Sequence, residues 1–532
     1  MKIWPLGFPI WMFFVNVKNK NHKKAGMMNI ENSLPLYDIA VIGGGINGVG
    51  IANDAAGRGL SVFLCEKDDF ASHTSSASSK LIHGGLRYLE HYEFRLVHEA
   101  LAEREVLMRK APHIVWPLRF VMPHRPHLRP AWLIRSGLFL YDYLGKRETL
   151  AASKKIHMNA SSPLIPEICL GFEYSDCAVD DSRLVILNAM QAREHGAELM
   201  TRTRCVCAEV VEGVWVLSLQ GAKGYFQIRA KALVNATGPW VEEFIKTQLD
   251  QPSPYKIRQV QGSHLVVKRL YEGDHAYILQ NNDRRIVFTI PYLNEFTLIG
   301  TTDQLYTQHL DQVEITSSET DYLLEVVNAH FKKPITKEDI VEYFSGVRPL
   351  CDDESDQPSA ITRDYTLALQ MVAPNAPLLS VFGGKLTTYR MLAESAMTRL
   401  KPYFKHMAPA WTKTEPLPGG EHFKSKLTLA TAIQRRVKGI SPTLAARWAS
   451  TYGTRVWKLL EGVAKLEDMG EYFADELYRV EVDYLIRVEW VQTVDDLLWR
   501  RTKLGYHVGS TEKRILEDYM MNRMGYTTGL IA

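Results

Sequence analysis

A glycine cluster that follows a short apolar strand constrains this chain more than any other feature. Residues 39–42 read Ile-Ala-Val-Ile, and Gly43, Gly45 and Gly48 then satisfy the spacing G-x-G-x-x-G. A helix-compatible run follows, and a second apolar strand ends at Glu66. In a βαβ unit such glycines allow a tight turn and close approach of a pyrophosphate to the helix N-terminus. The pattern predicts a dinucleotide-binding unit in which Glu66 accepts hydrogen bonds from ribose hydroxyls.

The alternative is a glycine-rich turn that serves only helix–strand packing, and the glycines do not decide which dinucleotide is bound. Length and composition indicate an ordinary globular protein: 532 residues, 46% hydrophobic and 23% charged. About two to four domains are expected. The net charge of +3 is too small to indicate nucleic-acid binding. The six cysteines lack C-x-x-C spacing, so we expect reduced thiols and no metal site.

Residues 1–33 form an N-terminal extension that we leave out of the fold prediction. The apolar part covers residues 3–15, shorter than the ~20 residues needed to span a bilayer. Lysines follow it rather than precede it, unlike a signal peptide. An interfacial anchor, a signal relic and a start codon placed too early all remain open, and we favour the last.

Further along the chain, glycines recur beside polar and charged residues. The Ser- and Thr-rich residues 71–80 directly follow Glu66 and are either a flexible loop or a cofactor contact. The next residues, HGGLRY at 83–88, indicate a tight loop that holds a His, an Arg and a Tyr over a pocket. Strand-like runs also end in glycine at residues 230–240 and 379–395, and the second precedes a helix. Both are predicted to return to the cofactor.

Other segments predict different structures. Period-two alternation over residues 255–303, with a turn at 291–294, predicts an antiparallel sheet in a substrate domain. Residues 116–144 mix arginines with aromatic and aliphatic residues. They suit either a lipid headgroup boundary or a buried helix whose arginines pair with acids. The basic segments 432–437 and 498–503 are further membrane candidates, within a helical region that begins near residue 404.

Four motifs together resemble the FAD-dependent glycerol-3-phosphate dehydrogenases, which are aerobic, membrane-associated flavoproteins. The motifs are IAVIGGGINGVG, SSKLIHGGLRYLE, GVRPL and FGGKLTTYR, in this order along the chain. The resemblance covers roughly residues 36–515. The second motif is far more specific than the glycine fingerprint.

The resemblance implies an α/β fold, α+β overall, with a Rossmann-type FAD-binding domain of the glutathione-reductase and amino-acid-oxidase-like superfamily. That domain is expected over residues 34–115, 170–250 and 345–403. An antiparallel substrate domain with a membrane-facing segment is expected over 116–169 and 251–344, and a helical C-terminal cap domain over 404–532.

The resemblance also implies the reaction. It is the oxidation of sn-glycerol 3-phosphate to dihydroxyacetone phosphate, with electrons passed through FAD to a membrane quinone. The expected protein is a homodimer bound peripherally to the anionic surface on the cytoplasmic face of the cell membrane. It binds no nucleic acid and no metal.

The site residues follow from the chemistry of a phosphorylated polyol and from the motifs. A phosphate dianion needs cations and forked donors, which Arg87, Arg348 and Lys385 offer together with the Tyr88 hydroxyl. The C2 hydroxyl needs a base, for which His83 and His264 are both candidates beside Arg348. The residues expected to bind FAD are Gly43, Gly44, Gly45, Asn47, Gly48, Glu66, Lys67, Thr74, Ser75, Ser79, Lys80, Leu81, Thr237, Gly238, Gly384, Lys385, Leu386 and Thr387.

Three other functions stay open. A flavin oxidase could use oxygen with the same substrate. An amine or amino-acid oxidase of the same superfamily binds a carboxylate, for which two arginines and a lysine are more than needed. A flavin-binding regulatory protein would carry out no turnover at all.

Overall fold

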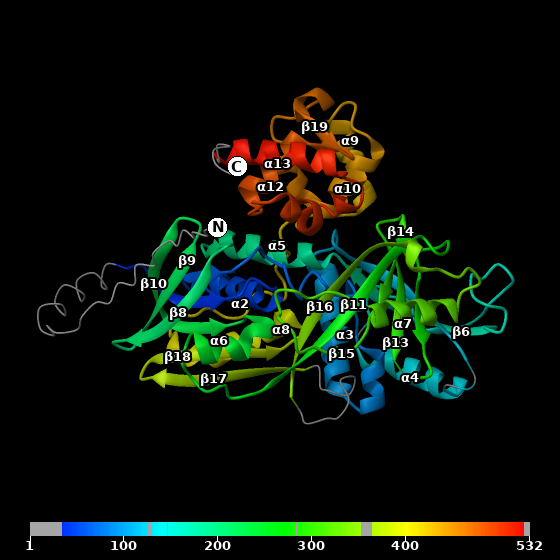
Figure 1. Ribbon diagram of the computed structural model, residues 1–532, viewed down its shortest axis with the longest axis horizontal. Helices are drawn as coiled ribbons and strands as arrows, with labels where there is room; N and C mark the ends of the chain where they lie inside the picture. The colour runs from blue at the N-terminus through cyan, green and yellow to red at the C-terminus, as the bar shows by residue number, and fades with distance from the viewer. Residues whose placement is uncertain are drawn as a thin grey trace, which may run out of the picture.

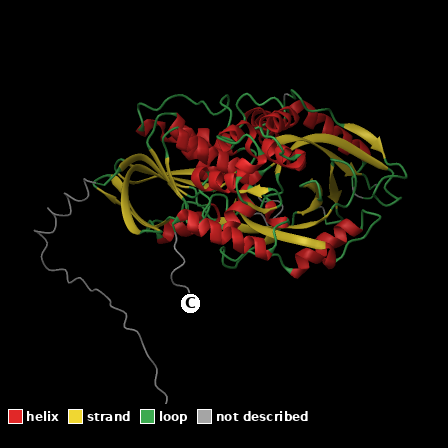
Figure 2. Ribbon diagram, turned by 90° about the horizontal axis from the view of Figure 1, so that it is seen from above, coloured by secondary structure: helices red, strands yellow, loops and turns green. Residues whose placement is uncertain are grey.

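The computed structural model describes residues 34–125, 127, 129–145, 147–283, 285–352 and 364–525. The prediction for residues 1–33 lies outside these residues. Two sheets lie side by side, and a helical body sits above helix α5 (Figure 1). Seen from above, strands gather toward the two ends of the molecule, with helices between them (Figure 2).

The first sheet is mixed and contains the parallel βαβ strands that the glycine fingerprint predicts. Its order is β17-β18-β10-β1-β2-β7, and β10 continues into an antiparallel extension with β9 and β8. The strands are β1 (Leu36–Ile42), β2 (Val62–Cys65), β7 (Glu198–Met200), β8 (Arg204–Val211), β9 (Val214–Gly221), β10 (Gly224–Asn235), β17 (Tyr365–Ala373) and β18 (Ala376–Gly383). The central strands are fully buried apolar runs, as expected for a parallel sheet covered on both faces.

Helices cover both faces of this first sheet. They are α2 (Ile46–Gly57), α5 (Asp181–Glu194), α6 (Val241–Thr247) and α8 (Tyr389–Leu400). Helix α2 packs against α5 and α8, and their apolar side chains form one continuous core with the sheet. The carboxyl ends of β1, β2 and β10 meet the N-terminus of α2 at one edge of that core.

The second sheet is mostly antiparallel, in the order β15-β11-β14-β13-β12-β4-β6-β3, with β16 paired to β11 and β5 to β6. The strands are β3 (Leu81–Ile82), β4 (Val115–Pro123), β5 (Lys154–His157), β6 (Leu170–Val179), β11 (Ile257–Lys268), β12 (Ala276–Gln280), β13 (Ile286–Tyr292), β14 (Phe296–Gly300), β15 (Gln304–Leu305) and β16 (Ile340–Cys351). The associated helices are η1 (Leu86–His91), α3 (Phe94–Lys110), α4 (Ala131–Leu144) and α7 (Ser317–Asn328).

Sheet membership differs from the predicted division of the chain. Strands β3, β6 and most of β16 fall in the ranges predicted for the FAD-binding domain, yet all three belong to the second sheet. The physical reason is pairing: β6 forms a long antiparallel ladder with β4, and β16 forms one with β11. An apolar strand pattern shows that a strand exists but not which neighbour it pairs with.

The helical body contains α9 (Lys426–Arg436), α10 (Pro442–Tyr452), α11 (Val456–Leu459), α12 (Arg479–Val488), the π-helix η7 (Asp496–Arg501) and α13 (Ser510–Met524). It has its own apolar core, centred on Trp448, Tyr452 and Leu485. Segment 498–503, predicted as a membrane candidate, is instead buried between this body and the first sheet: Leu498 and Arg501 are fully buried. That interpretation was therefore wrong, because the arginine pairs with acids inside the protein.

The arginines of residues 116–144 mostly bind within the protein. Arg129 pairs with Glu90 at 2.7 Å, and Arg135 donates to Ser153 at 3.0 Å. Unlike these arginines, many apolar side chains of α4 are exposed on the surface of the protein. No helix among the described residues is both long and apolar enough to cross a bilayer.

Candidate functional site

The turn between β1 and α2 is packed so tightly that only glycine fits. Gly43 has φ +112°, and a Cβ there would lie 2.4 Å from the carbonyl oxygen of Ala236. A Cβ on Gly48 would lie 1.9 Å from the carbonyl oxygen of Gly43. The contact of Gly43 with Ala236 places the end of β10 against the turn, and the contact of Gly48 with Gly43 places α2 against it. The backbone is thereby left open to a ligand at the helix N-terminus.

Glu66 lies at the end of β2 and is oriented by backbone donors. Its carboxylate accepts hydrogen bonds from the N–H groups of Gly44 (2.6 Å) and Asp68 (2.9 Å). Burial raises the pKa of Glu66 above its ordinary value, although these donors and His73 oppose the rise. The ligand atoms of Glu66, Asp68 and His73 lie close enough together to hold a metal ion, but Glu66 and His73 also line the cavity beside the glycine turn.

That cavity is bordered by the glycine turn, by β2 and by the start of α6. Its lining residues include Gly43, Gly45, Glu66, Lys67, Ser72, His73, Thr74, Ser75, Thr203, Arg204, Thr237, Gly238, Trp240, Glu243 and Gln248. Lys67 lies over the Trp240 ring, 4.0 Å from its centroid. The sequence did not indicate Thr203 or Arg204, because these residues reach the cavity only through long-range packing, whereas Trp240 ends the segment 230–240 that was predicted to return to the cofactor.

Residues 71–80 connect this cavity to the second sheet. Ser75 accepts a hydrogen bond from the N–H of Ile46 (3.0 Å), at the N-terminus of α2. Thr74 donates to the carbonyl of Val347 on β16 (2.7 Å). Ser79 Oγ lies 2.9 Å from Nε2 of His264 on β11. The loop therefore contacts both the N-terminus of α2 and the second sheet, and it is not a flexible surface segment.

Several residues predicted to bind the cofactor serve the protein's own contacts. Asn47 donates to the carbonyl of Gly383 (3.1 Å), and Lys80 pairs with Asp181 (2.9 Å). Leu81 is buried in the core of the second sheet, so only its backbone is available. The partly buried Leu386 packs against the first core. These contacts orient the segments around the cavity.

The guanidinium of Arg348 lies in the space that the absent side chain of Gly262 leaves open. It pairs with Asp303 at 2.5 Å and donates to the carbonyl of Thr302 at 2.8 Å. A Cβ on Gly262, which faces Gly346 across the β11–β16 ladder, would lie 1.9 Å from Arg348 Nη2. The guanidinium is thus fixed beside β11, two residues from His264 along that strand.

His264 is buried, with 2% of its surface exposed, and its ring stacks on Phe344 at 4.9 Å. Burial lowers the pKa of His264 well below its ordinary value, and the charges of Lys80 and Arg348 add to the decrease. The lowered pKa favours the neutral imidazole, which can accept a proton but is a weaker base than an exposed histidine.

The HGGLRY loop meets the FGGKLTTYR segment. The Nζ atom of Lys385 lies over the Tyr88 ring, 4.0 Å from its centroid. The backbone N–H of His83 donates to Thr387 at 3.4 Å. Arg87 is half-buried on η1, next to Tyr88. The structure thus brings together two motifs about 300 residues apart in the sequence, as the resemblance implies.

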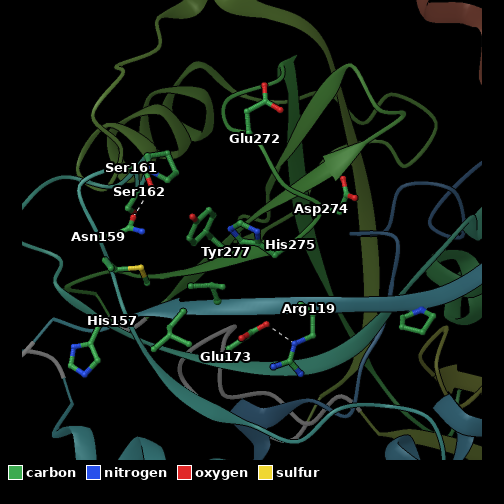
Figure 3. Close-up of a pocket in the computed structure, with 15 residues that line it drawn as sticks. Arg119, His157, Asn159, Ser161, Ser162, Glu173, Glu272, Asp274, His275 and Tyr277 are labelled. Carbon is green, nitrogen blue, oxygen red and sulfur yellow. Dashed lines mark hydrogen bonds and ion pairs between the residues drawn. The ribbon is translucent and has the colours of Figure 1, made fainter.

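A second cavity, of about 660 Å³, lies beside β4, β5, β6 and β12 of the second sheet. Figure 3 shows Arg119, His157, Glu173, Asp274, His275 and Tyr277 around it. Arg119 and Glu173 form an ion pair at 2.7 Å. None of the predicted site residues lines this cavity.

Comparison with known proteins gives the same assignment as the fold. Residues 38–390 match the family described as FAD dependent oxidoreductase, and residues 410–527 match the C-terminal domain of alpha-glycerophosphate oxidase. The glycerol-3-phosphate dehydrogenase of Pseudomonas aeruginosa is 64% identical, covering 92% of this chain and 95% of its own. The D-erythritol 1-phosphate dehydrogenase of Brucella abortus is 46% identical, covering 91% and 98%.

A solved structure confirms the fold. The glycerol-3-phosphate dehydrogenase of Bacillus halodurans complexed with FAD has a TM-score of 0.72, covering 95% of this chain and 94% of its own, at 24% identity. The chain belongs to the FAD-dependent oxidoreductases. Among these it falls in the glycerol-3-phosphate dehydrogenase family. FAD is the cofactor, and the glycine turn and the buried Glu66 carboxylate suit its pyrophosphate and ribose.

Proposed function

We propose that this protein oxidises sn-glycerol 3-phosphate to dihydroxyacetone phosphate. In this reaction a hydride leaves C2 and a proton leaves the C2 hydroxyl, which yields the ketone. FAD supplies the acceptor for the hydride and its two electrons. The protein has to bind the phosphate, orient C2 and accept the proton.

The predicted residues divide these tasks. Arg348 and Lys385, with Arg87 and the Tyr88 hydroxyl, bind the phosphate dianion. Asp303 fixes the Arg348 guanidinium in one orientation through their 2.5 Å contact. The proton goes to Nε2 of His264 or to His83. His264 is already oriented by Ser79 and by its stacking on Phe344.

One observation carries the proposal: the loop of residues 71–80 lines the FAD cavity and also contacts the predicted base His264 and the chain neighbour of Arg348 on the second sheet. Thr74 and Ser75 line the cavity. Ser79 contacts His264, and Thr74 contacts Val347, the neighbour of Arg348. A substrate bound by Arg348 and His264 thus lies beside the loop that lines the cofactor cavity.

Anaerobic reduction tests the proposal. Adding sn-glycerol 3-phosphate to the purified holoenzyme without oxygen is expected to bleach the visible flavin absorbance. D-erythritol 1-phosphate, the substrate named for a relative, is expected to bleach it far more slowly. If neither compound bleaches the flavin, the proposed reaction is rejected. If D-erythritol 1-phosphate bleaches it faster than sn-glycerol 3-phosphate does, D-erythritol 1-phosphate is the better assignment for the substrate.

Substitution of each candidate histidine tests which one accepts the proton of the C2 hydroxyl. Removal of the correct histidine is expected to lower kcat about 10²- to 10⁴-fold with unchanged flavin content. His83→Ala and His264→Ala are compared in the same assay. Wild-type turnover in both variants contradicts the assignment.

We propose a membrane quinone as the electron acceptor. The C-terminal match to a domain of alpha-glycerophosphate oxidase favours testing oxygen as the alternative. Turnover with a soluble quinone analogue, without stoichiometric hydrogen peroxide, supports the quinone. Hydrogen peroxide equal to the substrate consumed supports the oxidase.

We propose further that α4 binds the membrane surface. The helix buries Ile134, Leu138 and Tyr141 against the second sheet. Its opposite face exposes large apolar side chains at helical spacing: Trp132 (69%), Leu133 (47%), Phe139 (57%), Leu140 (38%) and Tyr143 (71%). Such a face suits the boundary between lipid headgroups and acyl chains.

A vesicle-binding assay tests this contact. The double variant Trp132→Glu/Phe139→Glu is expected to stay in solution when mixed with vesicles that contain anionic lipid, while the wild type floats with them. Tyr225→Glu is the matched control, because Tyr225 is equally exposed (74%) but lies on β10. Equal flotation of all three proteins contradicts the proposal.

The proposal also includes a homodimer on the cytoplasmic face of the cell membrane. The resemblance to the family supports both points. Sedimentation in detergent gives the mass of the assembly. Protease treatment of sealed inside-out and right-side-out membrane vesicles shows which face of the membrane carries the protein.

A further inference from the structure

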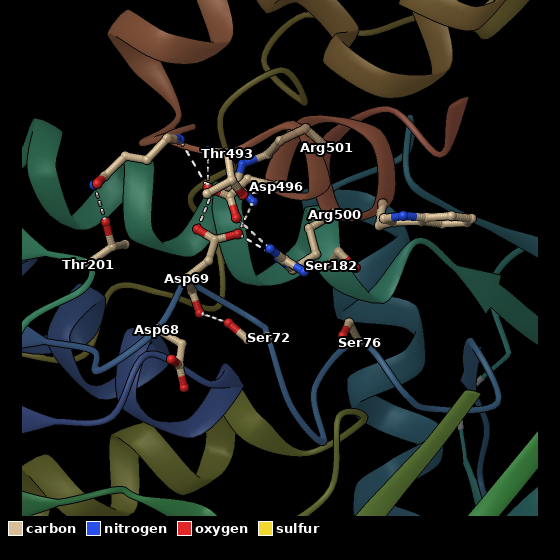
Figure 4. A network of polar contacts seen from close by, with 12 residues as sticks. Asp68, Asp69, Ser72, Ser76, Ser182, Thr201, Thr493, Asp496, Arg500 and Arg501 are labelled. Atoms are coloured by element: carbon tan, nitrogen blue, oxygen red, sulfur yellow. Dashed lines mark hydrogen bonds and ion pairs between the residues drawn. The ribbon is translucent and has the colours of Figure 1, made fainter. Parts of the chain in front are cut away.

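A buried polar network joins the helical body to the start of the FAD-site loop. Asp69, which is 1% exposed, lies three residues after Glu66. Both Nη atoms of Arg501 donate to its carboxylate, at 2.9 and 2.8 Å, and Nε of Arg500 donates at 2.6 Å. Figure 4 shows Asp69 between the loop and the two arginines of η7. A carboxylate early in the sequence is thus held by guanidinium groups about 430 residues later.

The two arginines are themselves fixed. Arg501 is fully buried and also donates to the carbonyl of Glu489, at 2.7 Å through Nη2. Arg500 bonds to Asp496, which accepts from Arg202 at 2.8 Å. Because each guanidinium is bound on more than one side, it presents its remaining donors to Asp69 in a set direction.

The same C-terminal segment holds the loop at two other places. The ring of Phe70, next to Asp69, meets Trp490 edge to face at 5.1 Å. At the far end of the loop, Lys80 pairs with Asp181, whose neighbour Ser182 receives a hydrogen bond from Lys503 at 2.9 Å. Residues 490–503 therefore contact the start of the loop directly, and its far end through Ser182 and Asp181.

Backbone hydrogen bonds connect Asp69 and its neighbours to the residues around the cavity. Its carbonyl accepts from the N–H of Ser72 at 3.2 Å, and Ala71 donates to the carbonyl of Gly44 at 3.2 Å. Ser72 lines the FAD cavity, and Gly44 bonds to Glu66. A displaced Asp69 thus moves backbone groups on both sides of Glu66.

We propose that Asp69, Arg500 and Arg501 are positioning residues for FAD binding, so that the helical body keeps the cofactor loop closed. This role does not depend on the identity of the substrate. The alternative is that the network only attaches the helical body to the rest of the chain. If the network positions the loop, breaking it accelerates FAD release. If the network only attaches the helical body, breaking it lowers stability without a specific effect on FAD release.

The experiment measures release of FAD from the holoenzyme, followed by the fluorescence of free flavin. Asp69→Asn keeps the shape of the side chain and removes its charge, and release is expected to accelerate tenfold or more. Arg501→Lys keeps the charge but loses the paired geometry, so an intermediate rate is expected. The KM for sn-glycerol 3-phosphate at saturating FAD is expected to stay unchanged.

The matched control is Arg447→Lys. Arg447 forms an equivalent double contact with the buried Glu481, at 2.7 and 2.8 Å, but lies inside the helical body and away from the loop. It is expected to lower the melting temperature without changing FAD release. Equal acceleration by Asp69→Asn and Arg447→Lys at equal loss of melting temperature overturns the proposal.

A second measurement uses the protein without FAD. Hydrogen exchange of the backbone amides at residues 68–76 is expected to rise in Asp69→Asn and to stay unchanged in Arg447→Lys. If Asp69→Asn does not fold, Arg501→Lys carries the same comparison. Unchanged exchange in the loop of a folded network variant also overturns the proposal.

Discussion

At the scale of single residues, the space beside Gly262 fixes the position of the Arg348 guanidinium. Its backbone is extended within β11, so the position requires no unusual torsion angle. What excludes a side chain is the guanidinium of Arg348, 1.9 Å from the position of a Cβ. The glycine therefore leaves the volume that the Arg348 guanidinium occupies.

We expect Gly262→Ala to raise the KM for sn-glycerol 3-phosphate at least tenfold, because Arg348 has to leave its contact with Asp303. Flavin content is expected to stay at the wild-type level. Steady-state kinetics and the flavin-to-protein ratio check both statements. Gly137→Ala, where a Cβ meets no atom within 4 Å, is the control. A wild-type KM in Gly262→Ala contradicts the role of Arg348.

Motif spacing could indicate Gly43, Gly48 and Glu66, because each requirement is local to one βαβ unit. It could not indicate Asp69 or Asp496. Their partners lie on η7, and no pattern in the sequence states that η7 packs against the first sheet. The predicted roles of His83, Arg87, Arg348 and Lys385 stay predictions until the variants are measured.

At the scale of elements, α7 is joined to β11 by one buried carboxylate. Glu319 is fully buried and accepts from Thr302 (2.6 Å), Ser263 (2.9 Å) and Gln261 (3.0 Å). It also completes a capping box with Thr316 at the start of the helix. The carboxylate thus fixes the helix to the strand that carries His264.

Glu319→Ala is expected to destabilise the protein by about 3 kcal/mol, because it leaves several buried donors without an acceptor. Thermal unfolding measures the loss. Glu325→Ala, on the exposed side of the same helix, is expected to change stability by less than about 0.5 kcal/mol. Equal stability of the two variants contradicts the role of Glu319.

Element prediction succeeded where one periodicity dominates. The alternation over residues 255–303 corresponds to the antiparallel core of the second sheet. The predicted turn at 291–294 begins two residues later, because Pro291 and Tyr292 still pair with β14. The membership of β6 and β16 was beyond prediction, since strand pairing depends on partners far along the chain.

At the scale of the whole molecule, acid is expected to weaken the attachment of the helical body. Burial raises the pKa of Asp496, but Arg202, the backbone N–H of Gln492 and Arg500 outweigh burial and bring the pKa down to about 2. Asp69, on the loop that faces η7, is the other carboxylate of this network. A lowered pKa stabilises the folded state above the unfolded value near pH 4, and this stability is lost as the pH falls toward 2.

The contribution of Asp496 amounts to about 2.5 kcal/mol. We therefore expect the stability difference between the wild type and Asp496→Asn to be largest above pH 4 and to vanish near pH 2. Chemical denaturation at a series of pH values gives this difference, and the comparison cancels the other carboxylates that titrate in the same range. A difference that does not vary with pH contradicts the assignment.

The order of strands in the first sheet has a consequence for biosynthesis. The glycine turn of residues 43–48 leaves the ribosome early, but β10 needs β18 as its neighbour, and β18 begins only at Ala376. The first sheet is therefore incomplete until more than two thirds of the chain has been made. We therefore expect FAD to bind only after most of the chain has been made, and we expect the unpaired strands of the nascent chain to be prone to aggregation until then.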